Sequence, residues 1–174
     1  MGWIGPALAD IVEVIYADHL WFRQNFLYLD GAKTQPELRA VWEPLAERLE
    51  LHAAAEEQII YPALLARGRS GDPKDETKDA IHDHNEIRDG IRKAGGCTVG
   101  SDDWFNAVEE ARTQNGKHMD EEEREALPDF VKSTTPDQRH DLAMQWLQFT
   151  YAHPGGRGVS GADKDPEGYV AQHS

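Results

Sequence analysis

The chain has 174 residues, a formal net charge of −14 at pH 7 and a sequence pI near 4.9. Its hydrophobic fraction of 39% and charged fraction of 29% are typical of a globular domain that buries a core, and they exclude a disordered chain. The negative charge, together with the lack of any basic patch, argues against nucleic acid as a partner.

The amino-terminal residues 1–19 carry no basic stretch and no long uncharged apolar run, so they resemble neither a secretory signal nor a membrane anchor. We therefore expect a soluble, cytoplasmic protein with no membrane partner. The single cysteine, Cys97, follows two glycines and cannot form an internal disulfide, so we place it in a loop.

Apolar residues recur with helical periodicity along most of the chain, which predicts an all-α fold. Clusters of Gly and Pro separate the helical segments. The predicted helices run from about Pro6 to Asp30, Pro36 to Arg67, Pro73 to Lys93, Asp102 to Lys132 and Pro136 to His153. Pro44 and Pro62 fall inside the second segment and should kink or break it.

The last part of the chain differs in composition from the helical segments. Residues 154–174 are rich in Gly, Asp and Lys and offer little to bury, so we expect a flexible tail. This predicts one domain over residues 1–153, made of four long helices and a short extra helix, followed by the tail.

Polar residues interrupt the apolar faces of the first two predicted helices. His19 lies inside the apolar stripe of the first helix, and the stripe of the second skips His52 and Glu56. A single core histidine is more often satisfied by its neighbours than bound to a metal, but a buried carboxylate is costly unless it is paired or binds a metal. His52 and Glu56 stand four residues apart on one helix face, so one ion could bind both.

The fourth predicted helix repeats this pattern, because its apolar stripe includes His118 and Glu122. The adjacent Glu121 and Glu123 are read as part of a solvated acidic face. In the third helix, Ile81, Ile87 and Ile91 define the apolar stripe, and His84 falls between them. His82 lies on the opposite face, so the helical period selects His84.

An internal repeat relates the two halves of the chain. HAAAEEQIIYP, which starts at His52, matches HMDEEEREALP, which starts at His118, in its His, Glu-Glu and Pro positions. Asp-His-x3-Arg also occurs twice, ending at Arg23 and at Arg88. Charged helices can produce such matches by chance, but the matched histidines also lie on apolar stripes. Two facing helical hairpins would bring six ligands to one centre: His19, His52, Glu56, His84, His118 and Glu122.

This ligand set predicts the kind of metal. Four imidazoles and two carboxylates are too many for one tetrahedral zinc ion, so two ions fit better. Mixed imidazole and carboxylate ligation suits iron or manganese. Ferritin-type di-iron sites use Glu-x-x-His pairs, whereas this chain has the reverse order at another spacing, which argues against kinship with ferritin.

His19, the HAAAEE segment with its following YP, DHNEIR and the HMDEEE segment together resemble the histidine–histidine–glutamate cation-binding domain of the hemerythrin-like family. The resemblance extends from about Ile4 to Trp146. It implies an up-and-down four-helix bundle that binds two iron ions, with Glu56 and Glu122 bridging them together with an oxo or hydroxo group.

The sequence also departs from the invertebrate oxygen carriers of the family that it resembles. Arg88 stands where those carriers have a further histidine four residues after His84, and their fourth-helix His-x4-Asp is His-x3-Glu here. Fewer histidines leave more open positions at the metals, which puts reversible oxygen carriage in doubt.

The resemblance implies a protein that reacts with hydrogen peroxide or O2, and catalase-like peroxide decomposition is the candidate activity. The alternative is non-enzymatic binding or sensing of iron, O2 or nitric oxide. No catalytic residue is assigned. Five further residues are expected either to contact the metal ligands from outside or, equally, to lie on the protein surface: Asp18, Asp83, Tyr61, Arg23 and Arg88.

Overall fold

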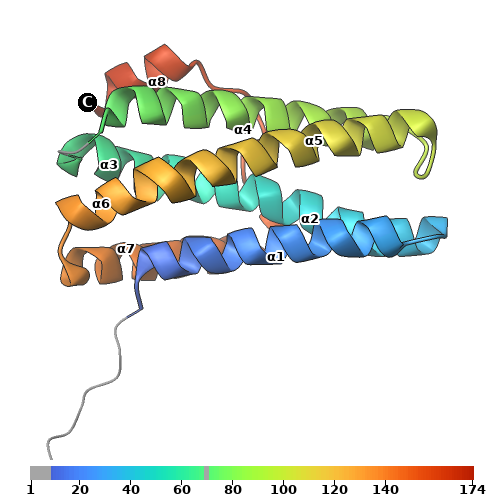
Figure 1. The fold of residues 1–174 in the computed structure, drawn as a ribbon, viewed down its shortest axis with the longest axis horizontal. Helices are drawn as coiled ribbons and strands as arrows, with labels where there is room; N and C mark the ends of the chain where they lie inside the picture. Colours follow the sequence, from blue (N-terminus) through green and yellow to red (C-terminus); the bar gives the residue numbers. More distant parts are fainter. Residues whose placement is uncertain (1–8, 69–70) are drawn as a thin grey trace, which may run out of the picture.

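The computed structural model describes residues 9–68 and 71–174, and these residues form a bundle of long helices that lie side by side (Figure 1). The elements in chain order are α1 (Ile11–Gly31), α2 (Gln35–Ala55), η1 (Glu56–Ile60), α3 (Tyr61–Arg67), α4 (Pro73–Gly95), α5 (Asp102–Glu121), η2 (Glu122–Ala126), α6 (Leu127–Ser133), α7 (Pro136–Ala152), η3 (Pro154–Gly156) and α8 (Pro166–His173). The described residues contain no strand, so the all-α prediction is confirmed.

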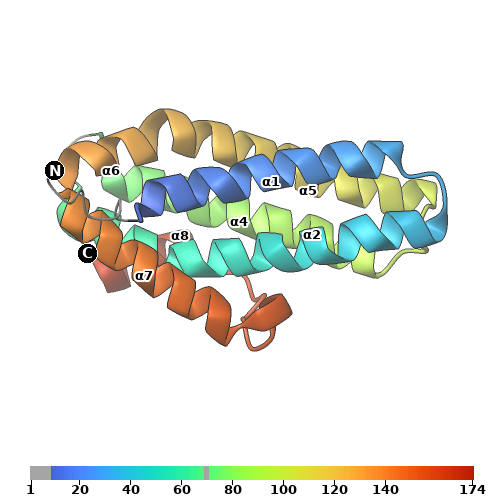
Figure 2. The ribbon, with the colours of Figure 1, turned by 90° about the horizontal axis from the view of Figure 1, so that it is seen from below.

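Four helical columns make the bundle: α1, the run α2–η1–α3, α4, and the run α5–η2–α6. Helix α7 packs beside α1 and α2 on the outside of the bundle (Figure 2). In the described part of the chain, no helix is both long enough and apolar enough to cross a membrane.

Side-chain caps set where the helices begin. The carboxylate of Asp10 accepts a hydrogen bond from the backbone N–H of Val12 at 3.0 Å, so α1 starts at Ile11. The predicted start at Pro6 lies outside the described residues. Thr34 and Thr135 form capping boxes at the starts of α2 and α7.

The prolines in the second predicted helix have different outcomes. Helix α2 continues through Pro44 without a break, because Pro44 is exposed and water can bind the carbonyl that loses its partner. Before Pro62 the chain changes to the π-helical segment η1, which ends with a hydrogen bond from Tyr61 N–H to the carbonyl of Glu56. Segment η2 precedes Pro128 in the same way.

The buried apolar side chains form two clusters along the bundle. One cluster contains Ile15, Ile60 and Trp146, and the other contains Phe22 and Trp104. The predicted ligands lie between these clusters, because each helical column passes from one cluster to the other at its histidine. The bundle therefore surrounds a polar centre with apolar packing on both sides.

The expectation that residues 154–174 have little to bury is wrong for the last part of this segment. Residues 166–173 form α8, which packs on α4 and α3 (Figure 1). Tyr169 and Val170 are buried and join the apolar cluster that contains Trp146. Burial of these two apolar side chains favours docking of this segment, although its average composition is polar.

Candidate metal centre

The six predicted ligands come together in the middle of the bundle. Each of them is at most 5% exposed. They are contributed by α1 (His19), α2 (His52), η1 (Glu56), α4 (His84), α5 (His118) and η2 (Glu122). Glu56 and Glu122 are each the first residue of a π-helical segment, a local feature that is frequent at functional sites.

The donor atoms form two groups that share one carboxylate. The first group is His19, His52, Glu56 and Glu122, and the second is Glu56, His84 and His118; within each group all donor atoms lie within 4.8 Å of one another. Glu56 Oε1 is 2.9 Å from Nε2 of His52, and its Oε2 is 3.1 Å from Nε2 of His84. Each oxygen of Glu56 thus faces a different group, which is the arrangement of a bridging carboxylate.

Glu122 offers a second carboxylate between the two groups. Its Oε2 lies 3.3 Å from Nε2 of His19 and 3.9 Å from Nε2 of His118. Nε2 of His118 is in turn 3.2 Å from Nε2 of His84. The Nε2 atoms of all four rings therefore point into one shared space.

Several of these atoms lack a hydrogen-bond partner. They are Nε2 of His19 and His52, Oε1 of Glu56, and both carboxylate oxygens of Glu122. These atoms lie close to one another but make no hydrogen bond among themselves. Leaving buried polar atoms unpaired is costly, so native proteins rarely do so without a reason. Bound cations would satisfy these atoms, and the imidazole and carboxylate donors fit iron or manganese.

On the α4 side of the centre, a carboxylate outside the ligand set holds the ring of His84 in place. Nδ1 of His84 lies 2.9 Å from Oε1 of Glu57, so the ring can donate its Nδ1–H there and keep Nε2 free for a metal. Arg88 donates to the same oxygen at 2.8 Å. Sequence reasoning missed Glu57, although the Glu-Glu pair at matching positions of both repeats was a signal for it.

The α1 side has the equivalent arrangement. Nδ1 of His19 lies 2.8 Å from Oε1 of Glu123, and Arg23 donates to that oxygen at 2.8 Å. Glu123 was expected on a solvated face, and this reading is wrong because its carboxylate turns toward the ring of His19. The repeated Asp-His-x3-Arg pattern now has a physical reason: in each half the arginine binds the carboxylate that orients the histidine.

The aspartates of the repeat differ between the halves. Asp18 accepts from Nδ1 of His52 at 3.0 Å and from Arg48 at 2.5 Å. Asp83 is buried, accepts from Lys117 at 2.8 Å through Oδ1, and has no partner for Oδ2. Neither aspartate lies on the surface.

Two further predictions concern Tyr61 and His82. The hydroxyl of Tyr61 donates to Glu56 Oε2 at 3.3 Å and lies 3.5 Å from Nε2 of His84, so it belongs to the centre. Burial and then the negative charge of Glu56 raise the pKa of Tyr61 well above its usual value, so it stays protonated at neutral pH. His82 is exposed, as the helical period predicted.

The charges of the metal-free centre favour protons on its histidines. Burial lowers the pKa of His52, but Glu56 and Asp18 outweigh burial and raise it to about 10. The pKa of His118 is also raised, because the hydrogen bond to Glu56 and the charge of Glu122 outweigh burial. Without metals, the two glutamates therefore attract protons to the positions that cations would take.

Fold and site together define a helical bundle with a buried histidine and carboxylate centre of the kind that binds metal ions. The family model of the hemerythrin HHE cation-binding domain matches residues 10–130, and the chain belongs to this family. An uncharacterized hemerythrin-like protein of Schizosaccharomyces pombe is 23% identical over 155 residues, which cover 83% of this chain and 73% of that protein. No solved structure gives a significant match.

Proposed function

We propose that this chain binds two iron ions and reacts with hydrogen peroxide or O2, with catalase-like peroxide decomposition as its activity. One observation carries the proposal: two groups of buried donor atoms share Glu56, and several of these atoms have no hydrogen-bond partner. His19 and His52 would hold one ion, and His84 and His118 the other. Glu56 and Glu122 would bridge them.

When bound, the ions would supply an electrophilic, redox-active centre for a small oxygen-containing molecule. The protein's own part is to fix the ligands and keep water away. Glu57, Glu123 and Asp18 hold their histidine rings through Nδ1, which leaves Nε2 for the metal. The rings of Phe22 and Trp146 pack edge-on against His52 with centroids 5.1 and 5.3 Å away, so they cover part of this ring with apolar surface.

A small cavity supports the choice of substrate. It has a volume of about 50 Å³ and is lined by Tyr61, His118 and Glu122, so it reaches the centre directly. On this measure about 10–15 Å³ is enough to hold one water molecule, so the space can admit a molecule of the size of O2 or hydrogen peroxide. The remaining polar lining is acidic and would repel anions: Glu76, Asp79, Asp83, Glu121 and Glu125.

The test has two parts. Elemental analysis of protein made in iron-replete medium should give about two irons per chain, and acid or a chelator should remove them, because imidazoles must be neutral and glutamates ionised to bind. Repeated additions of peroxide to the loaded protein, followed with an oxygen electrode, should then release oxygen each time. The controls are free iron at the same concentration and a Glu122→Ala variant.

The outcomes separate the alternatives. A single zinc, or no metal, would overturn the iron proposal. Two irons with a spectral change on peroxide, O2 or nitric oxide but no sustained oxygen release would instead indicate binding or sensing. Oxygen release no faster than that of free iron would count against the enzyme in the same way.

A further inference from the structure

The two halves of the centre are not equally shielded from solvent. The side chain of Glu57, which holds His84, is 2% exposed, whereas that of Glu123, which holds His19, is 25% exposed. Their arginines differ in the same direction, since Arg88 is buried and Arg23 is 40% exposed. The sequence repeat makes these carboxylates equivalent, so something outside the repeat causes the difference.

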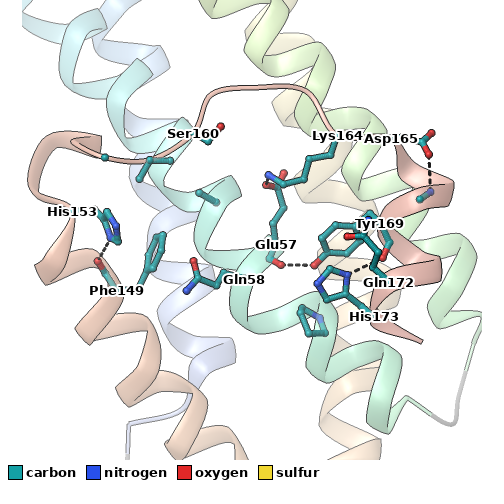
Figure 3. A pocket seen from close by; sticks show the side chains of 15 residues that line it. Glu57, Gln58, Phe149, His153, Ser160, Lys164, Asp165, Tyr169, Gln172 and His173 are labelled. Atoms are coloured by element: carbon teal, nitrogen blue, oxygen red, sulfur yellow. Dashed lines mark hydrogen bonds and ion pairs between the residues drawn. The ribbon is translucent and has the colours of Figure 1, made fainter.

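The C-terminal segment accounts for this difference, because it covers Glu57, and no bond of this kind to Glu123 is found among residues 9–68 and 71–174. Nζ of Lys164 donates to Oε2 of Glu57, and the hydroxyl of Tyr169 donates to the backbone carbonyl of Glu57 (Figure 3). Lys164 thus neutralises the oxygen that His84 does not use. Tyr169 binds the carbonyl at the start of the π-helical turn that carries Glu56.

Independent contacts hold this segment on α4. The side chain of Asn85 bonds both backbone groups of Lys164, donating to its carbonyl at 2.8 Å and accepting from its N–H at 3.0 Å. Arg92 donates to both carboxylate oxygens of Asp163 at 2.9 and 3.0 Å. Tyr169 and Val170 add buried apolar area. Lys164 is therefore fixed at its backbone as well as at its ammonium group.

Open space lies beside the segment and next to Glu57. A pocket of about 810 Å³ lies between it and α7, and Glu57, Lys164 and Tyr169 line that pocket (Figure 3). Removal of Lys164 or Tyr169 would therefore open Glu57 toward this pocket.

We propose that residues 161–170, the C-terminal strap, position His84 through Glu57 and so make the two metal positions inequivalent. Lys164 and Tyr169 are positioning residues: they touch neither metal position but fix the carboxylate that orients a ligand. The ion held by His84 and His118 is then released slowly, and the ion held by His19 and His52 is released first. This inference rests on the proposed pair of metal ions.

The physical size of the effect follows from the position of Glu57. Loss of an outer partner of a metal-binding histidine typically weakens metal binding by roughly 10- to 100-fold. Without Lys164, Glu57 keeps Arg88 and His84 but loses the cation at its second oxygen. We therefore expect metal binding to weaken about tenfold, near the lower end of this range, and only for one of the two ions.

The experiment follows metal release rather than catalysis. The protein is loaded with Co²⁺, whose visible absorption depends on its ligands, and mixed with an excess of chelator. The wild type should release cobalt in two phases of equal amplitude. Lys164→Met and Tyr169→Phe should accelerate the slow phase about tenfold and change its spectrum, while Lys164→Arg should restore slow release.

Matched variants test the assignment of the phases. Arg23→Met, on the exposed side, should accelerate only the fast phase. Lys93→Met removes an exposed lysine that pairs with Glu110 on the surface, and both phases should stay as in the wild type. Circular dichroism of each variant checks that the bundle is folded.

The outcomes distinguish the strap from the proposed function. Two bound ions with a single release phase, or an unchanged slow phase in both Lys164→Met and Tyr169→Phe, would overturn the strap. An equal acceleration in Lys93→Met would also overturn it, because the effect would then be one of overall charge. Absence of stoichiometric metal binding would overturn the metal centre itself.

Discussion

Replacement of His84 or of His82 by alanine tests the proposed ligand set on one helix. Both histidines lie in α4, two residues apart, but the ring of His84 is buried with Nε2 3.1 Å from Glu56 Oε2, while His82 is exposed. The two variants remove the same side chain from the same helix. They therefore differ only in which face of the helix loses it.

The structure gives the expected size of each effect. His84 is one of three residues in the second donor group, so H84A leaves the second ion with His118 and the two bridging glutamates. An outer partner is worth roughly 10- to 100-fold in metal affinity, and a direct ligand should be worth at least about 100-fold, or about 2.8 kcal/mol at 1.4 kcal/mol per tenfold. The first group keeps all its donors. H82A should change the free energy of unfolding by at most about 0.5 kcal/mol.

The assay is elemental analysis after the iron-loaded proteins pass through a desalting column that contains a weak chelator. We expect about two irons per chain for the wild type and H82A, and about one for H84A. H84A with the full iron content, or H82A with a reduced one, would refute the ligand assignment. Loss of iron from H82A alone would show that the register of α4 is wrong.

Two further predictions follow from the packing and from the charges of the centre. Gly90→Ala should destabilise the fold by about 1–2 kcal/mol, because a Cβ there would lie 2.7–2.9 Å from atoms of Ala111 and overpacking outweighs the gain in helix propensity. In Gly116→Ala the new Cβ meets nothing within 4 Å, so this variant should be more stable by up to about 1 kcal/mol. If denaturant unfolding curves show a change in stability of the same sign for both variants, the close contact of α4 with α5 is contradicted. Metal binding at pH 8 should release at least about one proton, because the metal-free pKa of His52 is about 10 and its imidazole must be neutral to bind, so the apparent affinity should rise with pH up to that value. Calorimetry in two buffers of different ionisation enthalpy measures the release, and an enthalpy that is independent of buffer would contradict it.

The sequence by itself determined the fold class and the six candidate ligands. Helical periodicity is a local property, so a polar residue in an apolar stripe such as His19 or Glu56 can be recognised without the partner helices. The period also separated His84 from His82. The repeat added the relation between the halves, because equivalent residues of two similar hairpins must face a common centre.

Local sequence gave less information about the helical geometry around the glutamates. Pro62 predicted a disturbance but not its form, since a proline can be absorbed by a kink, a break or a wider turn. The structure has a π-helical turn that starts at Glu56, and a second one starts at Glu122. The proline by itself does not select among these forms.

Only the tertiary structure decided which surface-like residues belong to the centre. Glu57 and Glu123 are charged residues on charged helices, and their roles depend on His84 and His19 approaching from other columns. The same holds for Lys164, more than a hundred residues away from Glu57 along the chain. A contact between distant segments has no local periodicity, so composition alone assigned the C-terminal strap to a flexible tail, whereas its few buried contacts fix it over one half of the centre.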